Sequence, residues 1–224
     1  MNQSLNINEI FYSIEGEGKR AGLPCVFIRL AGCNLSCLYC DTKYASDNKC
    51  SDFSFQELSI IDIVNKVQQY PCLNVTITGG EPLVQPNVYL LISALIRLNY
   101  EINIETNGSC LISPSNRFNN KLFYTMDWKT KSSGESNWMN SENLLRLQNI
   151  DVLKFVVGTN EDLLEVVEIC KCLPNKDVQV FVSPVYNKMS PLELVNFVKS
   201  HGLSNIRLQL QLHKIIWDSQ ERGV

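Results

Sequence analysis

The chain has 224 residues, and 45% of them are hydrophobic, which is enough for one domain with a sizeable core. Lysine and arginine total 20 against 23 acidic residues, so the net charge of −3 argues against electrostatic binding to nucleic acid or to an anionic membrane. Residues 1–10 lack the basic stretch and apolar core of a secretory signal, and no apolar run is long enough to span a bilayer, so we expect a cytoplasmic protein.

Short segments rich in β-branched and aromatic residues predict strands along the whole chain. In chain order these segments are residues 24–30, 74–78, 101–105, 123–128, 152–157, 178–182 and 206–211. Helical patterns lie between them, at residues 60–67, 90–98 and 161–173. A further helix is predicted to begin at the capping box of Ser190 and Glu193, with Pro191 in its first turn, and to end at Gly202.

The alternation of strands and helices predicts βαβ units and an open parallel sheet in an α/β fold. The elements are too few for a closed eightfold barrel of roughly 250 residues, so an incomplete barrel or a doubly wound sheet remains. The sequence has no internal repeat or linker, and we expect a single domain over residues 1–224.

Three of the nine cysteines lie close together, directly after the first of these strands. Cys33, Cys37 and Cys40 have C-x-x-x-C-x-x-C spacing, which can place three thiolates around one [4Fe–4S] cluster and leave one iron open for a ligand. The alternative is a structural zinc site, which would need a fourth ligand such as Cys25 or Cys50. The scattered cysteines are expected to pack as small hydrophobic residues.

A second motif, Thr-Gly-Gly-Glu-Pro at residues 78–82, follows the next predicted parallel strand. Ligands of open α/β sheets gather at the carboxyl ends of the strands, where both motifs are expected to lie. The paired glycines Gly79 and Gly80 would let a ligand approach the backbone, and Glu81 would offer an oxygen to a cationic amine. The alternative is a simple tight bend.

Together, the cysteine loop and the Gly-Gly-Glu-Pro segment resemble the radical S-adenosylmethionine superfamily. That resemblance implies a [4Fe–4S] cluster whose open iron is chelated by S-adenosylmethionine. It also implies one-electron reduction by an external donor of the flavodoxin or ferredoxin type, which cleaves the cofactor to a 5′-deoxyadenosyl radical.

Further segments resemble one family of this superfamily, the 7-carboxy-7-deazaguanine synthases. They are residues 9–18, Arg29, residues 40–42, 105–108, 127–129, 132–134, 153–155, 212–217 and 222–224. The resemblance implies a lyase of queuosine biosynthesis that contracts the ring of 6-carboxy-5,6,7,8-tetrahydropterin to 7-carboxy-7-deazaguanine with loss of ammonia. It also implies an incomplete (β/α) barrel, a homodimer and a need for Mg²⁺.

The resemblance assigns residues to each ligand, and it implies no catalytic residue beyond the cofactor ligands. The pterin would be held by Ile14, Glu15, Gly16, Arg29 and Thr78, and Mg²⁺ by the hydroxyl of Thr42. The S-adenosylmethionine site would comprise Tyr39, Cys40, Asp41, Gly80, Asp127, Lys129, Ser183, Pro184, Val185 and Tyr186. Simple ion pairs are the alternative for Arg29 and for the Asp127–Lys129 pair, and a turn-capping hydroxyl is the alternative for Thr42.

The chain departs from the family at Glu15, where glutamine is common, so any side-chain contact to the pterin would change. Two other functions remain open from the sequence. A radical activase of a partner protein would share the cysteine loop and the Gly-Gly-Glu segment, but it would not need Arg29 or Thr42. A zinc-stabilised binding module would use the cysteine loop for structure alone.

Overall fold

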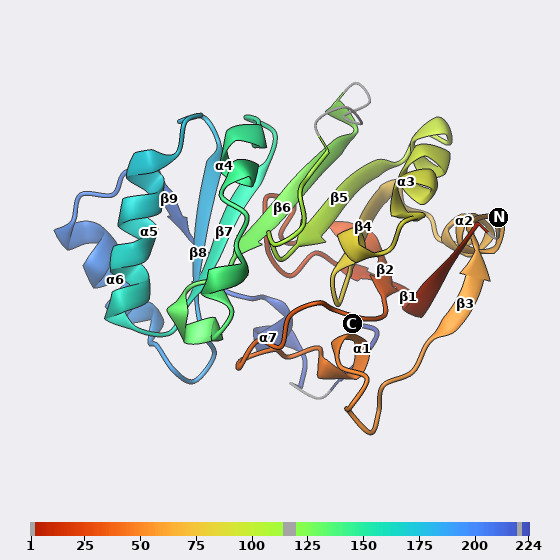
Figure 1. The fold of residues 1–224 in the computed structure, drawn as a ribbon, viewed down its shortest axis with the longest axis horizontal. Helices are drawn as coiled ribbons and strands as arrows, with labels where there is room; N and C mark the ends of the chain where they lie inside the picture. Colours follow the sequence, from red (N-terminus) through yellow and green to blue (C-terminus); the bar gives the residue numbers. More distant parts are fainter. Residues whose placement is uncertain (1–2, 114–119, 219–220) are drawn as a thin grey trace.

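The computed structural model describes residues 3–113, 120–218 and 221–224. Within them the chain forms one nine-stranded sheet in the order β3-β1-β2-β4-β5-β6-β7-β8-β9 (Figure 1). The strands are β1 Ser4–Ile14, β2 Pro24–Leu30, β3 Gln56–Ser59, β4 Asn74–Gly79, β5 Glu101–Thr106, β6 Leu122–Trp128, β7 Val152–Val157, β8 Gln179–Pro184 and β9 Ile206–Leu208.

The seven predicted strands are confirmed as β2 and β4 to β9, and they run parallel to one another. The predicted open parallel sheet is formed by these seven strands, and the sequence did not predict one edge, where β1 pairs antiparallel with both β2 and β3. The sheet is therefore mixed and open rather than parallel throughout, as in an incomplete barrel. The sequence did not reveal β3 because its four residues, Gln-Glu-Leu-Ser, are mostly exposed and carry no strong strand pattern.

Helices alternate with the parallel strands as predicted. The α-helices are α1 Lys43–Ser46, α2 Ile60–Val67, α3 Val88–Arg97, α4 Glu142–Arg146, α5 Asn160–Cys172, α6 Pro191–Ser200 and α7 His213–Ile216, with 3₁₀ turns at η1 Pro82–Val84, η4 Lys131–Ser133 and η5 Ser136–Trp138. The capping box of α6 is present, and Gly202 follows the helix with φ of +62°. The predicted start and end of this helix are thus confirmed.

The two faces of the sheet differ in chemistry. The outer face is apolar, and strand residues such as Ile77, Ile104 and Phe155 form one core with Leu91 of α3 and Leu163 of α5. Because side chains alternate along a strand, the next residues face inward. These inward residues are largely polar, and they include Thr78, Glu105, Asp127, Lys154 and Ser183.

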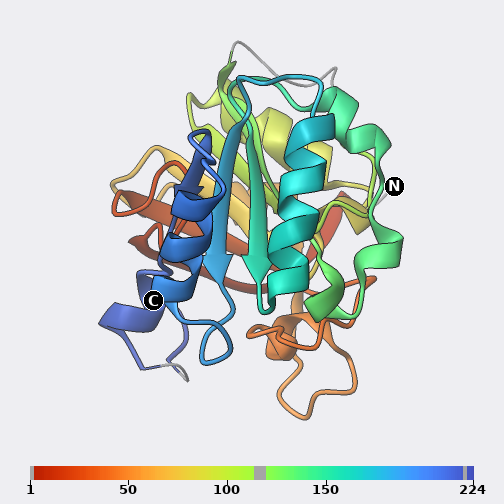
Figure 2. The ribbon, with the colours of Figure 1, turned by 90° about the vertical axis from the view of Figure 1, so that its left-hand side faces the viewer.

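The inner face opens toward the segment that follows β2. Figure 2 shows the arrowheads of β7 and β8 pointing to the end of the molecule where this orange segment lies. In Figure 1 the same segment, with α1, lies near α7 and the C-terminus. The carboxyl ends of the parallel strands therefore meet loops from both halves of the chain. Among the described residues, no helix has the length and apolar character needed to cross a membrane.

Candidate active site

The cysteine loop leaves β2 and is docked by backbone hydrogen bonds onto α1. The amide of Gly32 donates to the carbonyl of Ala45 at 2.7 Å, and that of Cys33 donates to Ser46 at 3.1 Å. Cys33, Cys37 and Cys40 are free thiols and are partly exposed.

The three thiols lie near enough to interact electrostatically. Burial raises the pKa of the Cys37 thiol to about 11 against the opposing charge of Lys129, and Asp127 and both other cysteines add to the rise. Bound iron ions reverse this preference, because a coordinating thiol is deprotonated outright. Three free thiols on one loop fit a cluster that offers a separate iron to each sulfur. Within the described residues, no group of three or more His, Cys, Asp or Glu side chains is close enough to hold a single metal ion.

The paired glycines Gly79 and Gly80 lie against the start of the cysteine loop. A Cβ on Gly80 would come within 2.0 Å of the carbonyl oxygen of Gly32, and one on Gly79 within 2.0 Å of that of Leu30. Backbone hydrogen bonds close this contact, from Gly80 to Leu30 at 3.1 Å and from Glu81 to Gly32 at 2.9 Å. The glycines therefore allow two segments of backbone to approach each other closely. The sequence predicted close approach of a ligand at these glycines, but it did not predict this contact within the protein.

The carboxylate of Glu81 is fully buried and points into the protein. It accepts hydrogen bonds from the backbone amides of Asn107 at 2.6 Å and Leu83 at 2.9 Å, and from the Thr106 hydroxyl at 2.9 Å. Burial raises the pKa of this carboxyl group, while the three hydrogen bonds lower it. The carboxylate therefore ties the end of β4 to the end of β5, and of the two Glu81 oxygens expected to meet a ligand amine only the backbone carbonyl stays a prediction.

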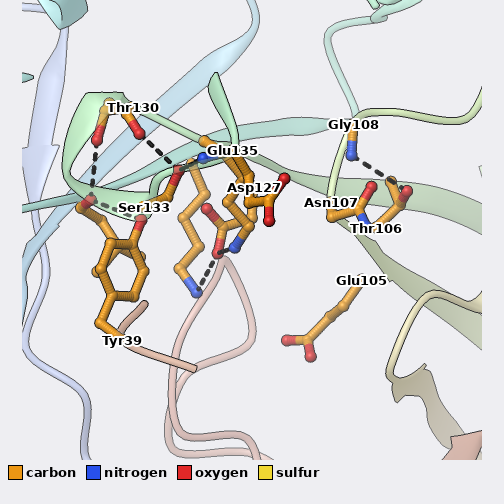
Figure 3. A network of polar contacts seen from close by, with 12 residues as sticks. Tyr39, Glu105, Thr106, Asn107, Gly108, Asp127, Thr130, Ser133 and Glu135 are labelled. Atoms are coloured by element: carbon orange, nitrogen blue, oxygen red, sulfur yellow. Dashed lines mark hydrogen bonds and ion pairs between the residues drawn. The ribbon is translucent and has the colours of Figure 1, made fainter. Parts of the chain in front are cut away.

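A short segment after β6 supports the other side of the cysteine loop. The amide of Leu38 donates to the carbonyl of Ser133 at 2.9 Å, and the amide of Ser36 donates to Glu135 at 2.9 Å. Hydrogen bonds from Ser133 to Thr130 and from Glu135 to Ser133 shape this segment (Figure 3). Tyr39 crosses to β7, where its hydroxyl donates to the carbonyl of Val156 at 3.2 Å.

Charged side chains pair at the inner ends of β6 and β7. Oδ2 of Asp127 lies 3.0 Å from Nζ of Lys129 and 3.5 Å from Nζ of Lys154. Lys154 is the residue paired with Asp127 on the adjacent strand β7, and it also forms an ion pair with Glu17. Burial alone would lower the pKa of Lys129, but the combined effect of Asp127, Tyr39 and Cys37 is larger and raises it. The ion-pair alternative for Asp127 and Lys129 therefore describes their contact.

Arg29, Thr78 and Thr42 also have protein partners. The Nε of Arg29 donates to Glu9 at 2.7 Å, and Tyr44 donates to the same carboxylate at 3.0 Å. Thr78 donates to Glu105 at 2.6 Å. Thr42 donates to Asp41 at 3.0 Å and precedes α1 without a side-chain cap, so its hydroxyl keeps acceptor capacity.

The loop that follows β1 carries Ile14, Glu15 and Gly16. Glu15 is buried and accepts a hydrogen bond from Thr76 at 2.6 Å, with Arg20 at 3.7 Å. Burial, together with repulsion from Glu105, raises the pKa of Glu15 to about 7. Gly16 packs against His213, whose Nδ1 would be 2.3 Å from a Cβ at this position. The Glu15 side chain thus belongs to the closed interior of the fold, whereas Gly16 meets the C-terminal segment.

Residues 183–186 extend from β8 toward the same end of the sheet. Ser183 is fully buried, and its hydroxyl oxygen, like Oδ1 of Asp127, has no hydrogen-bond partner among the described residues. Buried polar atoms are nearly always satisfied in proteins. Two unpaired ones at the ends of β6 and β8, on either side of β7, therefore fit a polar ligand such as the ribose or amino acid group of S-adenosylmethionine. Beyond them is a groove of about 550 Å³, which is lined by residues 184, 186–191, 193, 210, 211, 214 and 215.

Sequence reasoning gave no role to several residues of this site, namely Glu17, Lys154, Glu105, Asn107 and His213. A signal existed for Lys154, the one charged residue in a strand that is otherwise apolar and buried. Lys214 also lies 2.8 Å from Asp41, a contact between residues far apart in the sequence. No local pattern predicts such a pair.

Comparisons with known proteins agree with this geometry. Residues 27–113 match the family model described as the Radical SAM superfamily. A 7-carboxy-7-deazaguanine synthase of Clostridium acetobutylicum is 39% identical over 96% of this chain and 97% of its own length. One of Methanospirillum hungatei is 40% identical over 95% of this chain and 85% of its own.

Solved structures show the same fold. The crystal structure of QueE from Escherichia coli matches with a TM-score of 0.75 at 24% identity, and the match covers 94% of this chain and 96% of that one. Streptococcus suis SuiB bound to S-adenosylmethionine matches with a TM-score of 0.52 over 49% of its chain. Since the curated relatives match over nearly their whole length, the chain belongs to the 7-carboxy-7-deazaguanine synthase family of radical S-adenosylmethionine enzymes.

Proposed function

We propose that this enzyme converts 6-carboxy-5,6,7,8-tetrahydropterin to 7-carboxy-7-deazaguanine and ammonia. The observation that carries the proposal is the position of the three-cysteine loop, at the carboxyl ends of the parallel strands and over a polar inner face. The relatives that bear this name match over nearly the whole chain. A [4Fe–4S] cluster and S-adenosylmethionine are the cofactors of the superfamily.

Cys33, Cys37 and Cys40 hold the cluster in this proposal. When bound and reduced, the cluster would supply the electron that cleaves S-adenosylmethionine, and the resulting 5′-deoxyadenosyl radical would abstract hydrogen from the pterin. The cofactor site in this proposal is formed by the backbone of Gly80, residues 39–41, the pair Asp127 and Lys129, and residues 183–186. Support comes from the unpaired Oδ1 of Asp127 and Oγ of Ser183, which a polar cofactor would satisfy.

The pterin binds at the inner ends of β2 and β4 in this proposal. Arg29 has one nitrogen committed to Glu9, and its remaining guanidinium donors can grip the substrate carboxylate. Thr78 and the backbone of residues 14–16 contact the ring. Because Glu15 faces Arg20 and Thr76, its change from the common glutamine leaves the backbone contacts of this loop intact.

Thr42 provides the protein ligand for Mg²⁺ in this proposal. Magnesium keeps several waters and takes few protein ligands, so one hydroxyl beside a substrate carboxylate is chemically reasonable. The hydroxyl already donates to Asp41, which leaves its lone pairs for a cation.

The remaining parts of the proposal concern the setting of the reaction. Residues 1–224 act as one domain and assemble as a homodimer, and a flavodoxin- or ferredoxin-type protein supplies the electron. The reaction takes place in the cytoplasm, since free thiols and an oxygen-sensitive cluster need a reducing compartment.

The test is an anaerobic assay of the reconstituted enzyme with the carboxypterin, S-adenosylmethionine, reductant and Mg²⁺. We expect ammonia and the deazapurine in equal amounts, and a lower rate when Mg²⁺ is chelated. An iron-loaded enzyme that cleaves the cofactor but leaves the pterin unchanged would contradict this substrate and favour an activase. A colourless protein that contains zinc and no sulfide would favour a binding module.

A further inference from the structure

The side chain of Asn107 lies against the sulfur of Cys33. Asn107 follows β5 directly, and its Nδ2 is 3.7 Å from Cys33 Sγ, a distance at which an amide can donate to sulfur. The side chain is buried. The contact therefore lies inside the protein, where water competes little for either group.

The orientation of the Asn107 amide group follows from its other contacts. Its Oδ1 accepts hydrogen bonds from the backbone amide of Ser109 at 3.0 Å and from the Ser109 hydroxyl at 2.6 Å. A backbone amide can only donate, so the oxygen of Asn107 must face Ser109 and its NH₂ group must face the other way. That NH₂ group meets Cys33 and also Oδ1 of Asn34, at 3.1 Å.

The backbone of Asn107 is fixed by the buried carboxylate of Glu81. Oε2 of Glu81 accepts from the Asn107 amide at 2.6 Å, and Oε1 accepts from the hydroxyl of Thr106 at 2.9 Å. Figure 3 shows Thr106, Asn107 and Gly108 in sequence at the end of β5. Glu81 also holds the start of the cysteine loop, because its own amide donates to Gly32. Glu81 thus holds the backbone of Asn107 through its carboxylate and the start of the cysteine loop through its backbone amide.

The three cysteines differ in their hydrogen bonds. Cys33 accepts from the Asn107 side chain and from the backbone amide of Leu35 at 3.4 Å. Cys40 lies 3.6 Å from the hydroxyl of Ser46. Hydrogen bonds to cluster sulfurs and burial are the main means by which a protein sets the potential of an iron–sulfur cluster.

We propose that Asn107 is a positioning residue for the cluster, and that its amide donates to the Cys33 thiolate and raises the reduction potential. Reduction adds one electron from the external donor and makes the cluster more negative. A hydrogen-bond donor stabilises the more negative state more strongly, so it favours the reduced form. This inference rests on the proposed ligation of the cluster by Cys33.

The test compares Asn107→Ala and Asn107→Asp with Asn34→Ala as the matched control. Asn34→Ala removes the other acceptor of the Asn107 NH₂ group without touching the sulfur. Asn107→Asp keeps the oxygen that Ser109 requires, so it preserves the turn if the alanine variant fails to fold. Iron and sulfide content and the midpoint potential are measured on each reconstituted protein, the potential by a redox titration that follows the electron paramagnetic resonance signal of the reduced cluster.

We expect both Asn107 variants to shift the potential to more negative values, and Asn34→Ala to leave it unchanged. A tenfold lower equilibrium constant for reduction corresponds to about 59 mV for one electron, and we expect a shift of up to about this size in Asn107→Ala. The added charge of the aspartate makes its shift larger. Iron-loaded Asn107 variants whose potentials equal that of the control would overturn the inference.

A labelling experiment tests the contact in the unsubstituted protein. Asparagine labelled with nitrogen-15 should give a weak hyperfine coupling to the reduced cluster, which persists in Asn34→Ala and disappears in Asn107→Asp. A coupling that survives in Asn107→Asp would also overturn the inference. Failure of the proposed ligation looks different, because Cys33→Ala would then retain its full iron and sulfide content.

Discussion

Substitution of Glu15 by glutamine should stabilise the protein in a pH-dependent way. The folded protein holds this carboxyl group with a pKa of about 7 against an ordinary value of 4.5, because the group is buried and faces Glu105. The folded state therefore binds a proton that the unfolded state has lost between these two values, so folding becomes less favourable as pH rises through this window. Above pH 7 the ionised Glu15 lowers the free energy of unfolding by about 3 kcal/mol, since each pKa unit corresponds to about 1.4 kcal/mol.

Glutamine carries no charge and removes this cost. It can still accept the hydrogen bond of Thr76, and Arg20 keeps acceptors in the backbone carbonyls of Val75 and Glu101. Chemical unfolding of the reduced apoprotein at several pH values measures the effect. We expect Glu15→Gln to be more stable by up to about 3 kcal/mol at pH 8, with little difference below pH 4.5.

The control is Glu168→Gln, whose carboxylate forms an exposed pair with Lys171 on α5. Exposed pairs contribute little, so this variant should stay within about 0.5 kcal/mol of the unsubstituted protein at each pH. A constant difference for Glu15→Gln across the pH range, or a loss of stability at pH 8, would refute the account of Glu15 as an ionisable group buried at a cost.

Three further predictions concern the site. Gly80→Ala should prevent iron incorporation and lower the melting temperature, because its Cβ would lie 2.0 Å from the carbonyl oxygen of Gly32. The control Gly202→Ala should lose only about 1 kcal/mol of stability and keep its full iron content. An iron-loaded Gly80→Ala protein would contradict this prediction. Arg29→Lys should raise KM for the carboxypterin about tenfold or more with a similar kcat, and steady-state kinetics would count against the assignment if only kcat fell. Ser183→Ala should weaken S-adenosylmethionine binding about fivefold without lowering the stability of the apoprotein, because the hydroxyl has no partner among the described residues; unchanged affinity by calorimetry would remove Ser183 from the cofactor site.

The sequence predicted the parts of the fold that depend on local patterns. β2 and β7 have the predicted bounds because each is a short run of β-branched and apolar residues. The cap of α6 was found because a capping box is a local signal. β1 was missed because Asn6, Asn8 and Glu9 dilute its strand pattern, and it is stabilised by pairing with β2 and β3.

The site was predicted in its motifs but not in its contacts. The spacing of the cysteines places them on one loop, and chain order places the Gly-Gly-Glu segment on the adjacent strand. The direction of the Glu81 side chain depends on where the loop after β5 packs, which no local pattern contains. The same holds for Lys154, which meets Glu17 from a loop 137 residues earlier in the chain.

The most direct test of the account is whether the cluster has one iron that the protein leaves free. Mössbauer spectra of the protein reconstituted with iron-57 can distinguish the irons before and after S-adenosylmethionine is added. We expect the cofactor to change the signal of a single iron site and to leave the sites bound by Cys33, Cys37 and Cys40 unchanged. A protein without iron, or a cluster whose spectrum does not respond to the cofactor, would contradict the account.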